Sequence, residues 1–432
     1  MNYYSLNKQA PNVSFKEATI LGQAPDKGLY FPSNIPMLDQ QLISCMNDYS
    51  KEDLAFRVMQ PYIGNDIDEA SLFTIVSEAI NFDFPLVDIN SNIASLELFH
   101  GPTLAFKDVG ARFMSRCLGY FSKDRSNTIT VLVATSGDTG GAVANGFLGV
   151  EGVDVIILYP SGKVSPVQEL QLTTCGQNIT ALEIEGSFDD CQSMVKEAFM
   201  DEVLRKKMQL TSANSINIAR WLPQQLYYFY AYQQWADKFN PPVIAVPSGN
   251  FGNICAGLLA QVSGLPIKHF IAACNINDAV PDYLRTGRYQ SKLAVPTVSN
   301  AMDVGDPSNF IRILELFKQE FTTIKDCISG YTVSDETTKE TIANVYQQYQ
   351  YILDPHGAVA YHALDQYLNN YLSQKGIILE TAHPVKFPAT VEAAIGRSIE
   401  IPESAKSLLG KGKISIKMPA NFNALKEYLI SR

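Results

Sequence analysis

The chain has 432 residues, 46% of them hydrophobic and 18% charged, so it can fill two or three folded domains and is too apolar for wholesale disorder. Its formal net charge is −10, and its 34 lysines and arginines form no dense basic run, which is unlike a protein that binds nucleic acid or anionic membranes. We therefore expect a soluble protein that acts on a small molecule. No nucleic-acid, membrane or obligatory protein partner is expected.

Cysteine and histidine spacing excludes two further kinds of site. The seven cysteines are scattered without a CxxC pair, which suits neither a disulfide framework nor a zinc site, and the five histidines show no paired metal-ligand spacing. The N-terminal stretch lacks a basic start followed by an apolar core, and no segment reaches about 18 uninterrupted apolar residues. A cytoplasmic location is predicted, and no metal is expected.

The predicted elements divide the chain into three parts. To about residue 92, helix and turn signals are mixed, and we expect a separate N-terminal α/β unit. From about residue 128 onward, short apolar runs alternate with helix-like stretches, which is typical of parallel sheets covered by helices on both faces. Strands are predicted at 128–134, 153–160, 178–185, 241–247, 267–275 and 376–380. The fold class is therefore α/β, with two parallel-sheet domains after the N-terminal unit.

Paired prolines before a strand, near residues 236–242, suggest a boundary between the two parallel-sheet domains. The predicted domains are thus 1–92, 93–238 and 239–432, although the chain can cross between the last two.

Lys107, in the stretch GPTLAFKD, is the first candidate for chemistry. A lysine beside a phenylalanine usually lays its methylene stem along apolar surface and keeps its charge in water. In a partly dry pocket the same amine loses its proton readily and becomes a nucleophile toward carbonyls. The residue alone leaves both interpretations open, because the second needs a carbonyl partner.

Two predicted strand-to-helix turns are rich in small residues and lie at the carboxyl ends of strands, where open α/β sheets bind ligands. In the turn at 247–253, PSGNFGN, glycines allow close backbone approach and positive φ values that direct N–H groups at an anion. The turn at 135–141, TSGDTGG, carries Asp138, which opposes phosphate but can accept hydrogen bonds from a hydroxyl or an ammonium. An ordinary capped turn remains the alternative for each.

Two more stretches offer polar groups. Asn214, Ser215 and Arg220 lie close together in SANSINIAR, where they can grip a phosphate through charge-assisted hydrogen bonds or simply cap a helix. Thr381 follows the strand-like run GIILE, a position where a hydroxyl is usually a cap.

Several long motifs, taken in order, resemble those of threonine synthases, which are pyridoxal phosphate enzymes with the tryptophan-synthase-β-like (type II) fold. These motifs are VSFKEA, GLYFP, LELFHGPTLAFKD, ATSGDTGGAVA, ILYPSGKVSPVQE, SANSINIAR, VPSGNFGN, SNAMDVGDPSN and TAHPVKF. The resemblance covers almost the whole chain. It implies pyridoxal 5'-phosphate as cofactor, held in the cleft between the two parallel-sheet domains.

The resemblance also assigns roles to single positions. It implies that Lys107 binds the cofactor covalently and acts in catalysis, and that the hydroxyl of Thr381 faces the pyridine nitrogen. The residues implied to hold the cofactor phosphate are Gly249, Asn250, Phe251, Gly252 and Asn253. Those implied to meet the substrate are Thr135, Ser136 and Thr139, with Asn214, Ser215 and Arg220 at its phosphate.

Asp138 is a departure from the wider fold, in which many enzymes carry Asn beside the ring hydroxyl of the cofactor. We expect Asp138 to contact the cofactor, and its role stays open at this point.

The family reaction converts O-phospho-L-homoserine and water into L-threonine and phosphate, the last step of threonine biosynthesis, and it makes the chain a carbon–oxygen lyase. A sibling lyase, such as a serine or threonine dehydratase, is the nearest alternative and needs no second anion site. A cofactor-free binding protein with the same fold is another. A nicotinamide dehydrogenase is disfavoured because no GxGxxG motif occurs.

Overall fold

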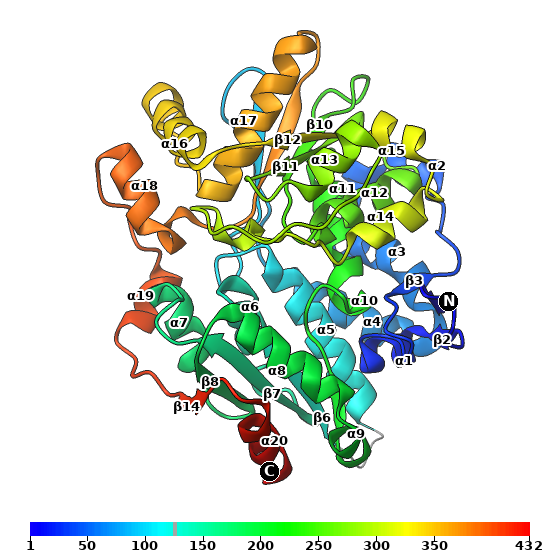
Figure 1. Cartoon of the computed structure of the whole chain (residues 1–432). Helices are drawn as coiled ribbons and strands as arrows, with labels where there is room; N and C mark the ends of the chain where they lie inside the picture. The colour runs from blue at the N-terminus through cyan, green and yellow to red at the C-terminus, as the bar shows by residue number, and fades with distance from the viewer. Residues whose placement is uncertain (124–127) are drawn as a thin grey trace.

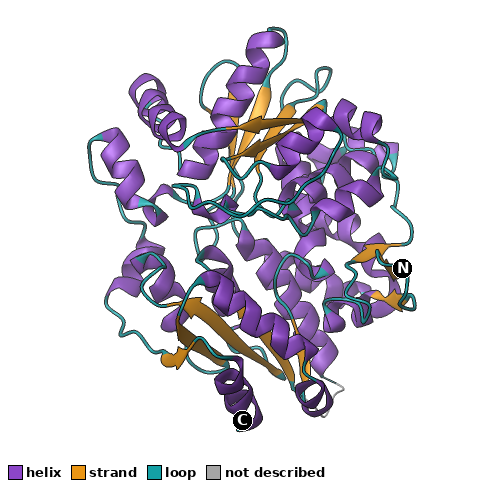
Figure 2. Cartoon of the chain, in the orientation of Figure 1, coloured by secondary structure: helices purple, strands orange, loops and turns teal. Residues whose placement is uncertain are grey.

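The computed structural model describes residues 1–123 and 128–432. Figure 1 shows two α/β bodies, one above the other, with the N-terminal elements packed against their side. Helices surround the strands of both bodies (Figure 2), as expected for sheets buried on both faces.

The N-terminal unit begins with a small antiparallel sheet in the order β2-β1-β3. Its strands are β1 (Asn2–Ser5), β2 (Val13–Ser14) and β3 (Tyr30–Pro32). Its helices are α1 (Phe15–Leu21), α2 (Gln40–Ser44), α3 (Lys51–Ile63) and α4 (Glu69–Ala79), with 3-10 turns η1 (Met46–Asp48) and η2 (Gly64–Asp66). Helix α1 begins where Ser14 and Glu17 form a capping box, which satisfies backbone donors at the first turn.

The lower body is a five-stranded parallel sheet in the order β14-β8-β7-β6-β9. Its strands are β6 (Ile129–Ala134), β7 (Val153–Pro160), β8 (Ile179–Glu185), β9 (Gln209–Thr211) and β14 (Ile416–Pro419). Its helices are α5 (Lys107–Ser122), α6 (Asp138–Phe147), α7 (Pro166–Thr173), α8 (Phe188–Met200), α9 (Glu202–Lys207), α19 (Glu403–Leu409) and α20 (Phe422–Ile430). Every residue of β6 is buried, which is why this strand is an unbroken apolar run.

The upper body is a six-stranded sheet in the order β12-β11-β10-β13-β5-β4, parallel except for the edge strand β4. Its strands are β4 (Leu86–Asp88), β5 (Ile93–Glu97), β10 (Val243–Pro247), β11 (His269–Cys274), β12 (Ile328–Thr332) and β13 (Gly376–Glu380). The remaining helices are α10 (Ile218–Trp221), α11 (Leu226–Gln234), α12 (Gly252–Val262), α13 (Ala279–Thr286), α14 (Phe310–Leu316), α15 (Phe321–Cys327), α16 (Asp335–Tyr349), α17 (Pro355–Asn370) and α18 (Pro388–Ile395). The 3-10 turns are η3 (Leu222–Gln225), η4 (Asn300–Met302) and η5 (Pro384–Lys386).

All six strands predicted from the sequence are present, and the α/β class is confirmed. Sheet membership crosses the expected domain boundaries at three strands. Strand β4 lies within 1–92 but pairs with β5 in the upper sheet. Strand β5 lies within 93–238 but pairs with β13 in the upper sheet, and β14 lies within 239–432 but pairs with β8 in the lower sheet. The ranges 1–92, 93–238 and 239–432 therefore remain a prediction for how the chain divides.

The N-terminal unit shares a hydrophobic core with the lower body. Phe15 of α1 packs edge-on against Phe113 and Phe121 of α5, and all three rings are almost completely buried. Among the helices that the structure describes, none is long and apolar enough to cross a membrane. Within the same residues, no group of three or more histidine, cysteine, aspartate or glutamate side chains is placed to hold a metal ion.

Candidate active site

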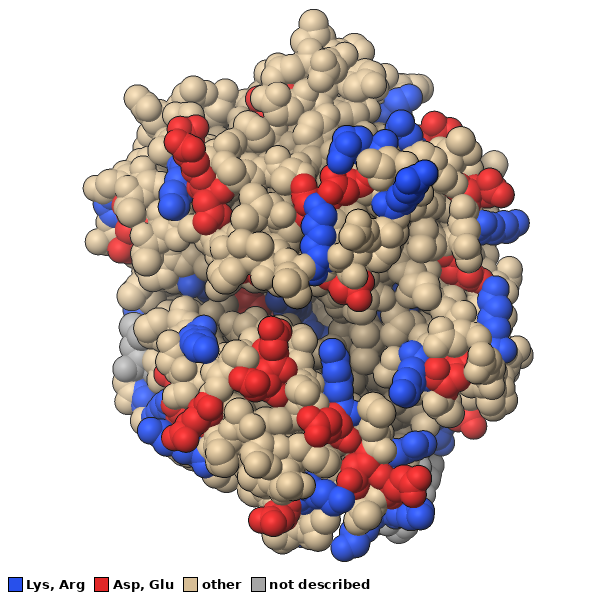
Figure 3. Space-filling model, in the orientation of Figure 1, with Lys and Arg blue, Asp and Glu red and all other residues tan. Residues whose placement is uncertain are grey.

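The candidate residues come from both bodies, which a hollow separates: the loop 135–139 follows β6 of the lower body, and the loop 249–253 and Thr381 follow β10 and β13 of the upper body. Figure 3 shows this hollow across the middle of one face, with charged side-chain atoms visible at its floor. The segment after β13 runs beside the segment that precedes α5: the Phe106 amide donates to the Thr381 carbonyl at 2.9 Å, and the His383 amide donates to the Leu104 carbonyl at 3.0 Å. This pairing brings buried Thr381 close to Lys107 although they are far apart in the sequence.

Lys107 is the first residue of α5. Its amine lies 5.5 Å from the centre of the Phe106 ring. Burial lowers the pKa of Lys107, the cations of Lys386 and Arg220 lower it further, and Asp138 acts in the opposite direction. The positive end of the helix dipole also disfavours an ammonium at this position. Together these effects favour the neutral amine, which is the nucleophilic form.

The loop before Lys107 is held tightly. Leu104 has a left-handed conformation, with φ of 59°, which is strained for a residue with a side chain. The Asp108 carboxylate accepts hydrogen bonds from the Thr103 amide at 2.9 Å and from its hydroxyl at 2.5 Å. On the other side, the Tyr227 hydroxyl donates to the Phe106 carbonyl. The loop therefore presents Lys107 from a fixed backbone.

The loop 249–253 joins β10 to α12, which begins at Gly252. The sequence predicted that the glycines carry positive φ values, and this was wrong: the left-handed residue is Phe251, with φ of 59°. The glycines provide space. A Cβ on Gly249 would lie 2.6 Å from the Met302 Cα, and one on Gly252 would lie 3.2 Å from the Ser215 Cβ. Neighbouring segments thus pack directly on the loop backbone.

Polar contacts orient the same loop. Asn250 donates through Nδ2 to the Ser215 hydroxyl at 2.9 Å and accepts through Oδ1 from the Ser308 amide at 2.7 Å. The Tyr228 hydroxyl donates to both oxygens of Asn253. Within the described residues, the buried Asn253 Nδ2 has no hydrogen-bond partner. A free donor at the N-terminus of a helix suits a phosphate.

The stretch 214–220 is only partly arranged as predicted. The Ser215 hydroxyl also accepts from Asn309 at 2.9 Å, so it supports the loop 249–253. Arg220 is almost fully buried on α10, and its Nη1 has no hydrogen-bond partner among the described residues, nor has Asn214 Oδ1. Burial lowers the pKa of Arg220 to about 10, so the guanidinium stays charged at neutral pH. An unpaired buried cation beside Lys107 is suited to an anionic ligand.

The TSGDTG loop joins β6 to α6. The Thr135 hydroxyl accepts from the amides of Gly137 at 3.0 Å and Gly140 at 2.9 Å, so it shapes the loop. Ser136 is exposed and Thr139 is half-buried. Of the three predicted hydroxyl residues in this loop, these two are therefore the more accessible ones.

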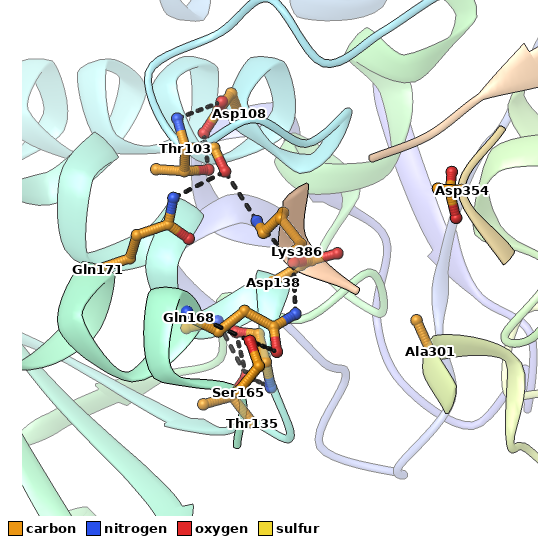
Figure 4. Close-up of polar contacts among 12 residues, drawn as sticks. Thr103, Asp108, Thr135, Asp138, Ser165, Gln168, Gln171, Ala301, Asp354 and Lys386 are labelled. Carbon is orange, nitrogen blue, oxygen red and sulfur yellow. Dashed lines mark hydrogen bonds and ion pairs between the residues drawn. The ribbon is translucent and has the colours of Figure 1, made fainter. Parts of the chain in front are cut away.

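Asp138 lies inside, at the start of α6, and is the centre of the polar group in Figure 4. Its Oδ1 accepts from the Lys386 ammonium at 2.6 Å and from Gln168 Nε2 at 2.7 Å. Burial alone would raise the pKa of Asp138, but Lys386, Lys107 and the hydrogen bond from Gln168 outweigh burial and hold it well below its ordinary value. Asp138 is therefore an ionised, buried carboxylate.

Lys386 and Gln168 were not predicted as site residues. Gln168 gave no signal, since a glutamine on a helix has no distinctive pattern. Lys386 did give one: it is a lone lysine among apolar residues just after a strand end, in TAHPVKF, much as Lys107 stands in GPTLAFKD.

The donor set fits pyridoxal phosphate. Lys107 offers an amine for its aldehyde, the start of α12 and Asn253 Nδ2 offer donors for its phosphate, and Thr381 offers a hydroxyl from the end of β13. The packing at Gly249 and Gly252 keeps the loop backbone close to its neighbours.

Comparisons with known proteins agree with this chemistry. A family model described as pyridoxal-phosphate dependent enzyme matches residues 88–380, and models for the threonine synthase N terminus and C-terminal region match residues 2–80 and 357–429. The threonine synthase of Escherichia coli (strain K12) is 42% identical over 433 residues, covering 100% of both chains. That of Saccharomyces cerevisiae is 38% identical over 462 residues, covering 91% of this chain and 89% of the yeast protein.

Solved structures give the same result. The E. coli threonine synthase structure superposes with a TM-score of 0.93 at 42% identity, covering 100% of both chains. A PLP-bound threonine synthase from Brucella melitensis superposes with a TM-score of 0.93 at 35% identity, covering 99% of this chain and 98% of that one. The predicted family, fold and cofactor are confirmed, and the chain belongs to the threonine synthase family of pyridoxal-phosphate-dependent enzymes.

Proposed function

We propose that this chain converts O-phospho-L-homoserine and water into L-threonine and phosphate, with pyridoxal phosphate bound at Lys107. The observation that supports this substrate is the guanidinium of Arg220, which is buried beside Lys107 with an unpartnered Nη1 within the described residues. A buried cation without a carboxylate partner is costly unless a ligand supplies the anion. A phosphorylated substrate supplies it, whereas the substrate of a serine or threonine dehydratase has no phosphate.

The proposed cofactor contacts divide among three segments. Lys107 would bond to the aldehyde, the loop 249–253 would hold the phosphate, and Thr381 would offer its hydroxyl to the ring nitrogen. When bound, pyridoxal phosphate supplies an electron sink that stabilises negative charge on substrate carbon.

The proton chemistry is assigned to Lys107. Its lowered pKa makes the neutral amine available to take the proton from the substrate Cα and to return it later at another carbon. Arg220 binds the substrate phosphate both before the reaction and while the phosphate leaves. Burial strengthens this attraction because little water screens the charges. Ser136 and Thr139 are assigned to the carboxylate and amine of the substrate.

The test is the simultaneous appearance of phosphate and threonine when purified protein is given O-phospho-L-homoserine. Arg220→Ala should raise KM for this substrate and lower kcat/KM by about 100-fold or more, since losing a hydrogen bond to a charged group costs about 1.5–3 kcal/mol and the buried phosphate loses its counter-charge. Arg57→Ala, at an exposed arginine of α3, is the matched control and should change neither value.

Two results would count against the proposal. Unchanged kcat/KM in Arg220→Ala would remove the argument for a phosphorylated substrate and favour a dehydratase. A holoenzyme that yields no labelled Lys107 peptide after borohydride reduction would remove the proposed attachment of the cofactor.

A further inference from the structure

Lys386 is a second buried lysine beside Lys107. Its side chain is 0% exposed and that of Asp138 is 4% exposed, and 2.6 Å separates Nζ from Oδ1 (Figure 4). The ammonium also donates to the Thr103 carbonyl at 2.7 Å, which in turn accepts from Gln171 Nε2 at 3.0 Å. These contacts fix Lys386 inside the protein.

The backbone around Lys386 is fixed too. Lys386 ends the 3-10 turn η5, which starts with Pro384 and is capped by the His383 ring accepting from the Val385 amide at 3.1 Å. Burying an ammonium and a carboxylate costs several kcal/mol per ion, and an apolar pair of similar size is often at least as stable. Stability alone therefore does not account for this pair.

The ion pair of Lys386 with Asp138 affects the charge around the Lys107 amine. The charged groups around that amine are Asp138 on α6, Lys386 on η5 and Arg220 on α10. The carboxylate of Asp108, the next residue in the chain, is engaged by Thr103. Asp138 is the anion among the three groups around Lys107, and its Oδ1 already accepts from Lys386 Nζ and Gln168 Nε2. Within the described residues, Lys107 takes part in no ion pair of 4.0 Å or less.

We propose that Lys386 is a positioning residue that holds the Asp138 carboxylate away from Lys107 and so keeps the Lys107 amine free to react. The proposal rests on the proposed attachment of the cofactor at Lys107. It concerns the charge of the pocket rather than contact with the reacting atoms. Without Lys386, the buried Asp138 carboxylate would lose the cation with which it forms an ion pair, its attraction for Lys107 would no longer be offset, and the ammonium form of Lys107 would be stabilised.

The experiment follows covalent uptake of pyridoxal phosphate by the full-length protein after its cofactor has been removed, read from the visible absorbance of the bound cofactor across a pH series. The uptake rate rises with the fraction of neutral Lys107. Lys386→Met should move the midpoint of this rise to higher pH. A midpoint that lies about one pH unit higher makes uptake about tenfold slower at a fixed pH below the midpoint.

Asp138→Asn should move the midpoint the other way, to lower pH, because Lys386 then remains as an uncompensated cation near Lys107. A merely structural role would impair both variants in the same direction. The double variant Asp138→Asn with Lys386→Met removes both charges and should bring the midpoint back toward that of the wild type. Lys426→Met breaks an ion pair with Asp201 of similar length, 2.6 Å, at the C-terminal helix, and should leave the midpoint unchanged.

An unchanged midpoint in Lys386→Met, or midpoints that move in the same direction in the two single variants, would overturn the proposal. If Lys386→Met does not fold, as judged by thermal melting, Asp138→Asn alone decides through the direction in which its midpoint moves. A wild-type protein that takes up the cofactor at another lysine, found by borohydride reduction and peptide mapping, would refute the proposed attachment at Lys107, and this outcome is recognisable before any variant is made.

Discussion

Replacing Gly249 by alanine should weaken cofactor binding by separating two packed loops. The new Cβ would lie 2.6 Å from the Met302 Cα and 2.9 Å from the Ala301 carbonyl oxygen, where ordinary contact begins at 3.4 Å. Both obstacles are backbone atoms, so no side chain can rotate out of the way. The loop 249–253 or the turn η4 must shift by roughly 0.8 Å at the contact, and overpacking of this kind costs about 1–3 kcal/mol.

If that cost falls on the loop geometry proposed to hold the cofactor phosphate, the Kd for pyridoxal phosphate rises about 5- to 150-fold. The assay is a titration of cofactor-free protein followed by visible absorbance, together with thermal melting of the same samples. Gly412→Ala is the control, because a Cβ there meets nothing within 4 Å. A Gly249→Ala protein with wild-type affinity and melting temperature would refute the argument from close approach.

Three other changes test separate contacts. Glu380→Gln should remove one pH-dependent contribution to stability. Burial and Asp354 raise the pKa of Glu380 well above 4.5, so the stabilising contribution of Glu380 is present at low pH and is lost as pH rises above about 4.5 toward the raised pKa. Denaturant titrations that give the same pH dependence for the variant and the wild type in this range would contradict this. Ser215→Ala leaves Asn250 Nδ2 without its acceptor and should cost about 1–3 kcal/mol of unfolding free energy, measured against the wild type in urea. Thr381→Asp should raise transamination by-products, since a carboxylate stabilises a protonated ring nitrogen, and keto-acid assays showing no increase would count against the proposed place of Thr381.

The fold could be predicted from local patterns because its signals are local. Strands such as β6 are unbroken apolar runs, and the loops 135–141 and 247–253 carry small residues directly after predicted strands. The order of the strands in the sheets could not be predicted from such local patterns. The pairings of β5 with β13 and of β14 with β8 join residues hundreds of positions apart, and nothing in the strands themselves names the partner.

The site shows the same limit. Lys107 and Arg220 could be proposed from the sequence because they stand in distinctive motifs. The partner of Asp138 was not found, because Lys386 reaches it only through the placement of η5 beside Thr103. The roles of the hydroxyl side chains were hardest to predict. The Thr135 hydroxyl accepts from loop backbone amides and the Ser215 hydroxyl accepts from the Asn250 side chain. These partners depend on the three-dimensional neighbours of each hydroxyl and not on its residue type.

The positions of β5 and β14 in the sheets have a consequence for how the protein folds during synthesis. Strand β5 is synthesised early but pairs with β13, which comes more than 270 residues later. The lower sheet is not complete until β14, close to the C-terminus, has been synthesised. Contacts between such distant segments carry a large loop-closure cost and form slowly. Each sheet is therefore completed only after a distant segment of the chain has been made, and a fragment cut at the expected domain boundaries would lack one of its strands. Until β13 and β14 have been synthesised, the edges of β5 and β8 that they pair with stay open, and such edges favour aggregation unless a chaperone covers them.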